Sequence, residues 1–190
     1  MARTTPGPHP DLLAAKELVY DPCGFTCSAP VPEAESAEYA AHAFTLDGLA
    51  VRFRAARTTP TKAGQFVTLW QRSPGGPIRP FDTADPVDLF VVAARDDGDD
   101  PDGDGNRDGD RTGQFVFSMD ALHRNGVVSA HGSGGKRAFR VYPPWVAAPN
   151  RQASAAQAWQ LDHFLPLPLA GPGALARARE LYRPRAVGGA

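Results

Sequence analysis

Cysteine is scarce in this sequence, where only Cys23 and Cys27 occur among 190 residues. A structural zinc site needs about four ligands, and no second cysteine pair or cysteine–histidine pair accompanies these two. A disulfide between them would be unusual in a cytosolic protein. We therefore interpret them as two reduced thiols in a small turn, and we expect neither a metal site nor a resident cofactor.

Long hydrophobic runs are also missing. The uncharged apolar stretches are far too short to cross a bilayer, which argues against a membrane span. Residues 1–8 lack the apolar core of a secretory signal. We therefore expect a cytoplasmic protein with no membrane partner.

Lysine is rare too, because 17 of the 20 basic residues are arginine. Arginine favours bidentate contacts with phosphates, although the ratio can equally reflect a GC-rich coding bias. The net charge of −1 hides two different regions, since eight of the 21 acidic residues and only three of the 20 basic ones lie between residues 95 and 111. The remainder of the chain therefore carries a net charge of about +4.

The acidic residues form a run at 95–112, which we expect to be a solvated insertion between two strands. Residues 100–108 match the start of an EF-hand calcium loop, whose twelfth position needs a bidentate glutamate. That position is Arg111, and the flanking segments have strand patterns rather than helical ones. We therefore assign no calcium site, and we hypothesise that the insertion weakly shields a basic surface of the same molecule.

What the sequence does contain is two basic segments, residues 51–70 and 134–145, that alternate large apolar residues with cations. This period indicates strands with one buried face and one face that displays guanidinium groups. Arg52 and Arg54 should share the displayed face, since side chains two residues apart lie on the same side of a strand. Such a surface suits a polyanion, in particular nucleic acid. The alternative is an ordinary solvated strand face with local ion pairs.

The candidate contacts are the basic residues of these segments, joined by one aromatic and one amide side chain that could touch bases or phosphates. They are Arg52, Arg54, Arg57, Lys62, Lys136, Arg137, Arg140, Trp145 and Gln157. Burial in the core is the alternative for Trp145, and simple solvent exposure is the alternative for Gln157.

Periodicity and turn residues predict the architecture. Helical segments are expected at 11–19, 33–42, 120–124, 152–164 and 173–182, and strands at 49–57, 65–71, 87–94, 113–118 and 137–142. Asp47-Gly48 predicts a type I′ hairpin turn, and the apolar run at 87–93 predicts a central strand. We expect one α+β domain at 10–182, with five to six mostly antiparallel strands flanked by helices, between a flexible arm at 1–9 and a flexible tail at 183–190.

A series of motifs runs in order through residues 33–164. It includes Glu-Ser-Ala-Glu-Tyr at 35–39, Thr-Pro-Thr-Lys-Ala-Gly-Gln-Phe-Val-Thr-Leu-Trp at 59–70, Asp-Pro-Val-Asp at 85–88, Gly-Gln-Phe-Val-Phe at 113–117, Arg-Val-Tyr-Pro-Pro-Trp at 140–145 and Gln-Ala-Trp-Gln at 157–160. Through these motifs the chain resembles the MepB-like family, which consists of uncharacterised or nucleic-acid-binding proteins of bacteria.

The resemblance implies a restriction-endonuclease-like core, in which helices cover a mixed sheet in a three-layer arrangement. Nucleases of that fold assemble a magnesium site from an aspartate on one strand and a Glu-x-Lys or its equivalent on the next. Asp88 could supply the first carboxylate, and Glu38 a carboxylate from a helix. Family members tend to carry Pro-Lys where this chain has Ser118-Met119. The resemblance therefore implies a degenerate nuclease site that is retained for binding.

We thus expect a catalytically inactive protein that binds DNA or RNA through its basic segments. Two alternatives stay open. One is a magnesium-dependent nuclease centred on Asp88 and Glu38, and only this alternative needs a magnesium cofactor. The other is an interaction protein that binds an acidic partner or a phosphorylated metabolite instead of nucleic acid.

Overall fold

The computed structural model describes residues 7–96 and 111–183. Most of the arm expected at 1–9, the calcium-loop-like part of the acidic insertion and nearly all of the tail expected at 183–190 lie outside the described residues. In chain order the elements are α1 (Pro10–Ala15), η1 (Lys16–Tyr20), α2 (Asp21–Cys23), β1 (Val31–Pro32), η2 (Ala37–Tyr39), β2 (His42–Leu46), β3 (Leu49–Ala55), β4 (Arg57–Thr59), β5 (Lys62–Thr68), β6 (Trp70–Arg72), β7 (Ile78–Pro80), β8 (Leu89–Arg95), β9 (Thr112–Ser118), α3 (Met119–Arg124), β10 (Ala138–Val141), α4 (Arg151–Leu161), β11 (Phe164–Leu167) and α5 (Ala174–Tyr182).

A mixed six-stranded sheet with the order β1-β2-β3-β8-β9-β11 forms the centre of the molecule. Only β3 and β8 run parallel, and every other pair in this sheet is antiparallel. The prediction of an α+β fold with a mostly antiparallel mixed sheet flanked by helices is confirmed. The apolar run of β8 is buried on both faces, as expected of a central strand.

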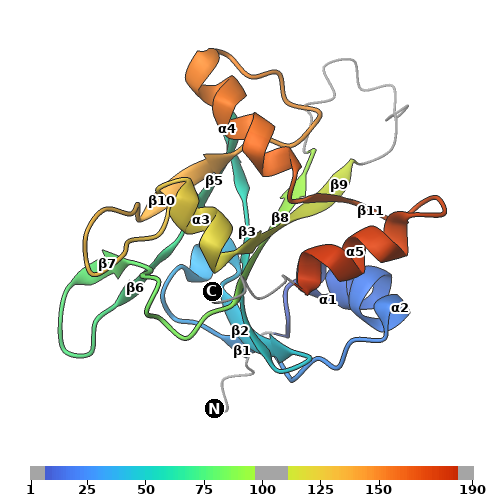
Figure 1. The fold of residues 1–190 in the computed structure, drawn as a ribbon, viewed down its shortest axis with the longest axis horizontal. Coiled ribbons are helices and arrows are strands. Elements are labelled where there is room, and N and C mark those ends of the chain that lie inside the picture. Colours follow the sequence, from blue (N-terminus) through green and yellow to red (C-terminus); the bar gives the residue numbers. More distant parts are fainter. Residues whose placement is uncertain (1–6, 97–110, 184–190) are drawn as a thin grey trace, which may run out of the picture.

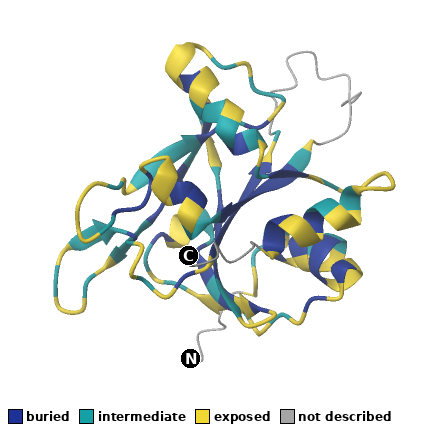
Figure 2. Cartoon of the chain, in the orientation of Figure 1, coloured by how far each residue is buried: buried dark blue, intermediate teal, exposed yellow. Residues whose placement is uncertain are grey.

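Two hydrophobic clusters lie on opposite faces of this sheet (Figures 1 and 2). In the first cluster, α1, η1, α2 and α5 pack on one face, where Leu89, Val91 and Ala93 of β8 project. In the second, a smaller sheet of β10, β5 and β4 packs with α3 on the face that carries Phe90 and Val92. Successive side chains of β8 therefore project into two cores on opposite faces of the sheet. The helices, the six-stranded sheet and the smaller sheet with α3 form three layers.

The hairpin prediction is confirmed, because Asp47 and Gly48 join β2 to β3 with φ values of 49° and 85°. Two positive φ values are what a type I′ turn requires. The predicted helix at 33–42 is wrong: only the single turn η2 forms, between residues in the left-handed conformation at Ser36 and Ala40. Neither left-handed residue can continue a right-handed helix.

Strand boundaries differ from the sequence prediction in the second half of the chain. The strand expected at 65–71 ends at Thr68, and Trp70–Arg72 pairs separately with β7. The edge strand β11 was missed, because Pro166 and Pro168 interrupt the strand pattern. In α3, Ser118 rather than Asp120 caps the helix, since its hydroxyl accepts a hydrogen bond from the Ala121 amide at 3.1 Å. Among the described residues, no helix has the length and hydropathy of a membrane span.

Candidate functional site

Three side chains from three neighbouring strands stand side by side on the smaller sheet. The register pairs Phe66 of β5 with Arg140 of β10 on one side and with Arg57 of β4 on the other. Directly opposed residues of antiparallel strands project from the same face. Arg57, Phe66 and Arg140 therefore form a row of two cations with an aromatic ring between them, which we call the arginine row.

The guanidinium of Arg140 is held in a fixed position. Its Nη2 donates to Thr59 Oγ1 at 2.8 Å, and its Nη1 donates to the Gly64 carbonyl at 3.2 Å. Its central carbon lies 5.7 Å from the centroid of the Phe66 ring, within cation–π range. The second Nη1 hydrogen is directed to the Ala63 carbonyl at 3.4 Å. Arginine has five N–H donors, so these contacts leave Nε and one Nη2 hydrogen for an anion. In the described residues, Arg140 has no carboxylate partner.

The segment before β2 contacts β5 at Phe66 and Thr68 and extends the aromatic part of the arginine row. The Tyr39 ring lies 6.1 Å from the Phe66 ring, and the Thr68 hydroxyl donates to Ser36 Oγ at 2.8 Å. Partial burial raises the pKa of Tyr39, and Glu38 raises it further while Arg57 lowers it. The Tyr39 hydroxyl therefore lies near one negative side chain, Glu38, and one positive side chain, Arg57.

Arg52 and Arg54 correct the sequence prediction most directly. They share one face of β3 as expected, but Glu33 pairs with both guanidinium groups on that face. Arg54 is only 1% exposed, and its Nη1 donates to Glu33 Oε2 at 2.6 Å and to the Phe53 carbonyl at 2.8 Å. Arg52 Nε lies 3.1 Å from the other carboxylate oxygen of Glu33. Arg54 is a buried structural residue, and the prediction that it is displayed to a polyanion is wrong.

The other predicted contacts divide into exposed cations and packed side chains. Arg57, Lys62, Lys136 and Arg137 are exposed, and none of them forms an ion pair within residues 7–96 and 111–183. Lys136 and Arg137 precede β10, at the opposite end of that strand from Arg140.

Gln157 and Trp145 serve the packing of α4 and the loop before it. The Gln157 amide donates to the carbonyls of Val146 at 2.8 Å and Pro143 at 3.1 Å, so its role is to hold that loop. These bonds engage the Gln157 amide nitrogen, and the contact of Gln157 with a phosphate or base edge stays a prediction. The half-buried Trp145 ring packs edge-on against Phe164 at 5.7 Å, and Trp145 also lines a cavity together with Lys62.

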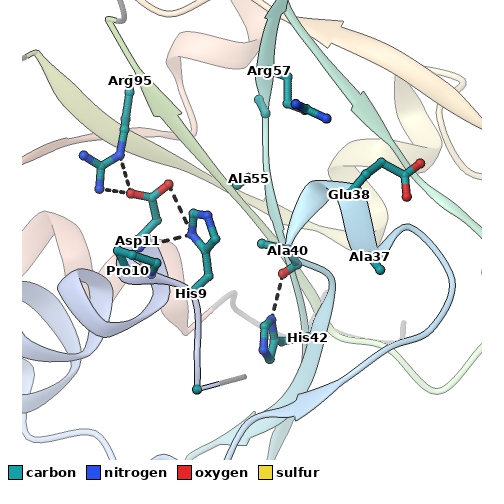
Figure 3. A pocket seen from close by; sticks show the side chains of 12 residues that line it. His9, Pro10, Asp11, Ala37, Glu38, Ala40, His42, Ala55, Arg57 and Arg95 are labelled. Atoms are coloured by element: carbon teal, nitrogen blue, oxygen red, sulfur yellow. Dashed lines mark hydrogen bonds and ion pairs between the residues drawn. The ribbon is translucent and has the colours of Figure 1, made fainter. Parts of the chain in front are cut away.

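A cavity of about 630 Å³ opens beside the arginine row (Figure 3). Its apolar lining consists of small residues, namely Pro10, Ala37, Ala40, Ala55 and Ala56. Its polar lining comes from several elements and consists of His9, Asp11, Glu38, His42, Arg57 and Arg95. Arg57 and Glu38 stand on one side of the cavity and His9 and Asp11 on the other. Asp11 forms an ion pair with Arg95.

The alternative nuclease centre is not assembled. Glu38 lines the cavity at the carboxyl end of β3, together with Ala55. Asp88 lies at the opposite end, where its Oδ2 accepts a hydrogen bond from the Ala50 amide at 2.7 Å. Ala50 and Ala55 are five residue steps apart on β3, which is roughly 16 Å of extended chain. In the part of the chain that the structure describes, no three His, Cys, Asp or Glu side chains are grouped as metal ligands.

Sequence reasoning missed Phe66, Tyr39 and His42. Phe66 follows the alternation of β5, yet only pairing with two other strands shows that both of its neighbours are arginines. His42 and Tyr39 were assigned to a helix that does not form, so their positions at the cavity and over Phe66 were not foreseeable.

Comparisons with known proteins identify a family and a solved structure of similar fold. The family model described as MepB-like matches residues 33–166. A solved structure described as the crystal structure of MepB superimposes with a TM-score of 0.64 at 28% sequence identity, covering 74% of this chain and 87% of that one. No curated protein matches the chain.

Proposed function

This chain belongs to the MepB-like family, and from that premise we propose that it binds DNA or RNA through the arginine row and the exposed cations around it. The observation that carries the proposal is the row itself, in which Phe66 lies between Arg57 and Arg140. Phosphates attract guanidinium groups, and an aromatic ring between two of them offers a stacking surface for a base. A cytoplasmic location, where both nucleic acids are present, is part of the same proposal.

Arg57 and Lys62 are exposed cations without an ion-pair partner among the described residues. This favours nucleic-acid binding over the alternative of an ordinary solvated strand face. In an ordinary solvated face the cations are paired locally, as Arg72 is with Glu35 and Arg79 with Asp85. Arg57 and Lys62 have no such partner among the described residues. Unpaired cations can replace counterions along a phosphate backbone, which makes binding strongly salt-dependent.

Binding without cleavage is the form of the proposal that the geometry supports. Glu38 and Asp88 lie at opposite ends of β3, so they cannot share a metal ion in this conformation. Ser118, at the position where the family tends to carry its lysine motif, caps α3 with its hydroxyl. We therefore expect DNA and RNA to remain intact in the presence of magnesium.

The double variant Arg57→Ala/Arg140→Ala tests the proposal. Fluorescence anisotropy of labelled single- and double-stranded DNA and RNA over a salt series should show weaker binding, and a salt slope reduced by about one to two units, because each lost phosphate contact removes about 0.7 to 0.9. The matched control is Arg124→Ala/Arg177→Ala, which removes the same charge from two arginines that pair with Asp120 and Glu180.

Two outcomes would contradict the proposal. If both double variants bind with the same affinity and slope, the row is not the contact surface. If heparin or polyphosphate competes as well as any oligonucleotide, an acidic partner other than nucleic acid becomes the better candidate. Gel analysis of the same samples reports cleavage, and cut oligonucleotide would show that the chain is a nuclease.

A further inference from the structure

The cavity beside the arginine row contains a carboxylate that phosphate binding does not explain. Glu38 is exposed on η2 and makes no ion pair with any residue in the described ranges. It stands on the same side of the cavity as Arg57. A free carboxylate repels phosphates, so its presence next to the row opposes simple polyanion binding. Its two oxygens could instead accept hydrogen bonds from N–H groups of a ligand.

His42 adds a second acceptor to the cavity. Its Nδ1 lies 2.8 Å from the carbonyl oxygen of Ala40. Because a carbonyl oxygen only accepts, Nδ1 carries a proton, and in that tautomer Nε2 is an acceptor. The ring is 7% exposed and lines the cavity, with Nε2 on the side turned away from Ala40.

The remaining lining suits a flat heterocycle. Pro10, Ala37, Ala40 and Ala55 present small apolar surfaces, and the volume of about 630 Å³ lies within the range typical of small-ligand sites. Arg57 belongs to both the cavity and the arginine row. A strand held on the row therefore has a base-sized recess within reach of its sugar–phosphate backbone.

Hydrogen-bond polarity selects among the bases. Guanine is the base whose pairing edge carries two adjacent donors, N1–H and the N2 amino group, and these match the two oxygens of a carboxylate. Adenine and cytosine place an acceptor beside their amino donor, and uracil or thymine places its single N–H between two carbonyls. A carboxylate that uses both oxygens on adjacent positions of the pairing edge, as Glu38 can, would therefore meet an acceptor in every base except guanine.

We propose, resting on the proposed function, that this cavity takes an unpaired guanine of the bound strand, with Glu38 accepting from its pairing edge and Arg57 contacting the adjacent phosphate. The protein would then prefer guanine at one position of a single-stranded segment. Hypoxanthine lacks the N2 amino group and should bind more weakly than guanine.

Short labelled oligonucleotides with one central guanine, hypoxanthine or adenine in a thymine or uracil background test this inference. We expect the wild-type protein to prefer guanine over adenine by roughly five- to a hundredfold, the range of one bidentate base contact. Glu38→Gln should remove most of this preference and leave the affinity for the adenine oligonucleotide unchanged or higher. The matched control Glu35→Gln removes the same charge from the same segment, but from a carboxylate paired with Arg72, and should keep the preference.

The outcomes separate this inference from the proposed function. If the wild type binds all three oligonucleotides equally while Arg57→Ala/Arg140→Ala weakens all of them, the guanine site is wrong and the nucleic-acid surface stands. If the wild type binds none, the proposed function fails and the inference fails with it. Guanosine monophosphate should compete only weakly, because it lacks the contacts of the row. Competition at the concentration of the oligonucleotide would overturn the assignment to a strand.

Discussion

Two pairs of arginines come from the basic segments of the sequence and have opposite surroundings. Arg52 and Arg54 lie on a strand inside the six-stranded sheet, where Glu33 pairs with both of them. Arg57 and Arg140 lie on the outer strands of a three-stranded sheet, and neither has a carboxylate partner among the described residues. Alternation therefore determines which face a cation occupies, whereas the segment packed on that face determines whether the cation is available to a ligand.

The largest effect is expected from breaking the buried pair. Glu33→Gln leaves the guanidinium of Arg54, 1% exposed, without its carboxylate, and should lower the free energy of unfolding by about 3–5 kcal/mol in urea denaturation. The double variant Glu33→Gln/Arg54→Met removes the buried charge as well and should be less destabilised than the single variant. Glu38→Gln, at an exposed unpaired carboxylate, should stay within about 0.5 kcal/mol of the wild type. A Glu33→Gln protein as stable as Glu38→Gln would show that the pair is not structural.

A smaller effect is expected at Gln157, which the sequence assigns to the ligand and the structure assigns to the loop. Gln157→Leu leaves the carbonyls of Pro143 and Val146 without their donor, so stability should fall by about 1–2 kcal/mol with unchanged affinity for nucleic acid. Gln152→Leu, at an exposed position of the same helix, is the control and should change neither quantity. Loss of affinity in a folded Gln157→Leu protein would restore the original assignment.

The smallest effect concerns a paired arginine at the surface. Arg79 donates to both carboxylate oxygens of Asp85, at 2.7 and 2.9 Å, and this hydrogen bonding lowers the pKa of Asp85 below its ordinary value of 3.8. The folded state therefore binds fewer protons than the unfolded state, so the stabilisation is complete above the ordinary pKa and is lost as pH falls through the lowered one.

Between pH 5 and pH 3, Asp85→Asn should lose about 1 kcal/mol less stability than the wild type in urea denaturation. Asp120→Asn, an exposed control, should follow the wild type, and parallel curves for Asp85→Asn and wild type would contradict the role of the pair.

Local patterns predicted the main elements of the fold. The apolar run of β8, the Asp47-Gly48 turn and the helices α4 and α5 needed only hydrophobic period and turn chemistry. The segment at 33–42 failed because its conformation depends on long-range contacts, in particular Glu33 with Arg54 and Ser36 with Thr68. The periodic pattern within residues 33–42 carries no information about these contacts, because their partners lie more than twenty residues away in the sequence.

The candidate site was predicted in its composition and not in its arrangement. Among the basic candidates, Arg57, Lys62, Lys136 and Arg137 are exposed as expected, while Arg54 is not. The aromatic member of the row was not foreseen, since the candidate aromatic residue was Trp145. Phe66 became a candidate only when strand pairing placed it between two arginines.

By itself, the sequence determined the family, the α+β class, the central strand and which residues alternate on each strand, because these follow from local chemistry and from motifs in order. Only the tertiary structure decided which arginines are buried with a carboxylate, which stand unpaired around Phe66, and that Glu38 and Asp88 lie at opposite ends of β3. The physical reason is that side-chain availability depends on what the chain places over a surface, and that placement is a sum of distant contacts which no local period encodes.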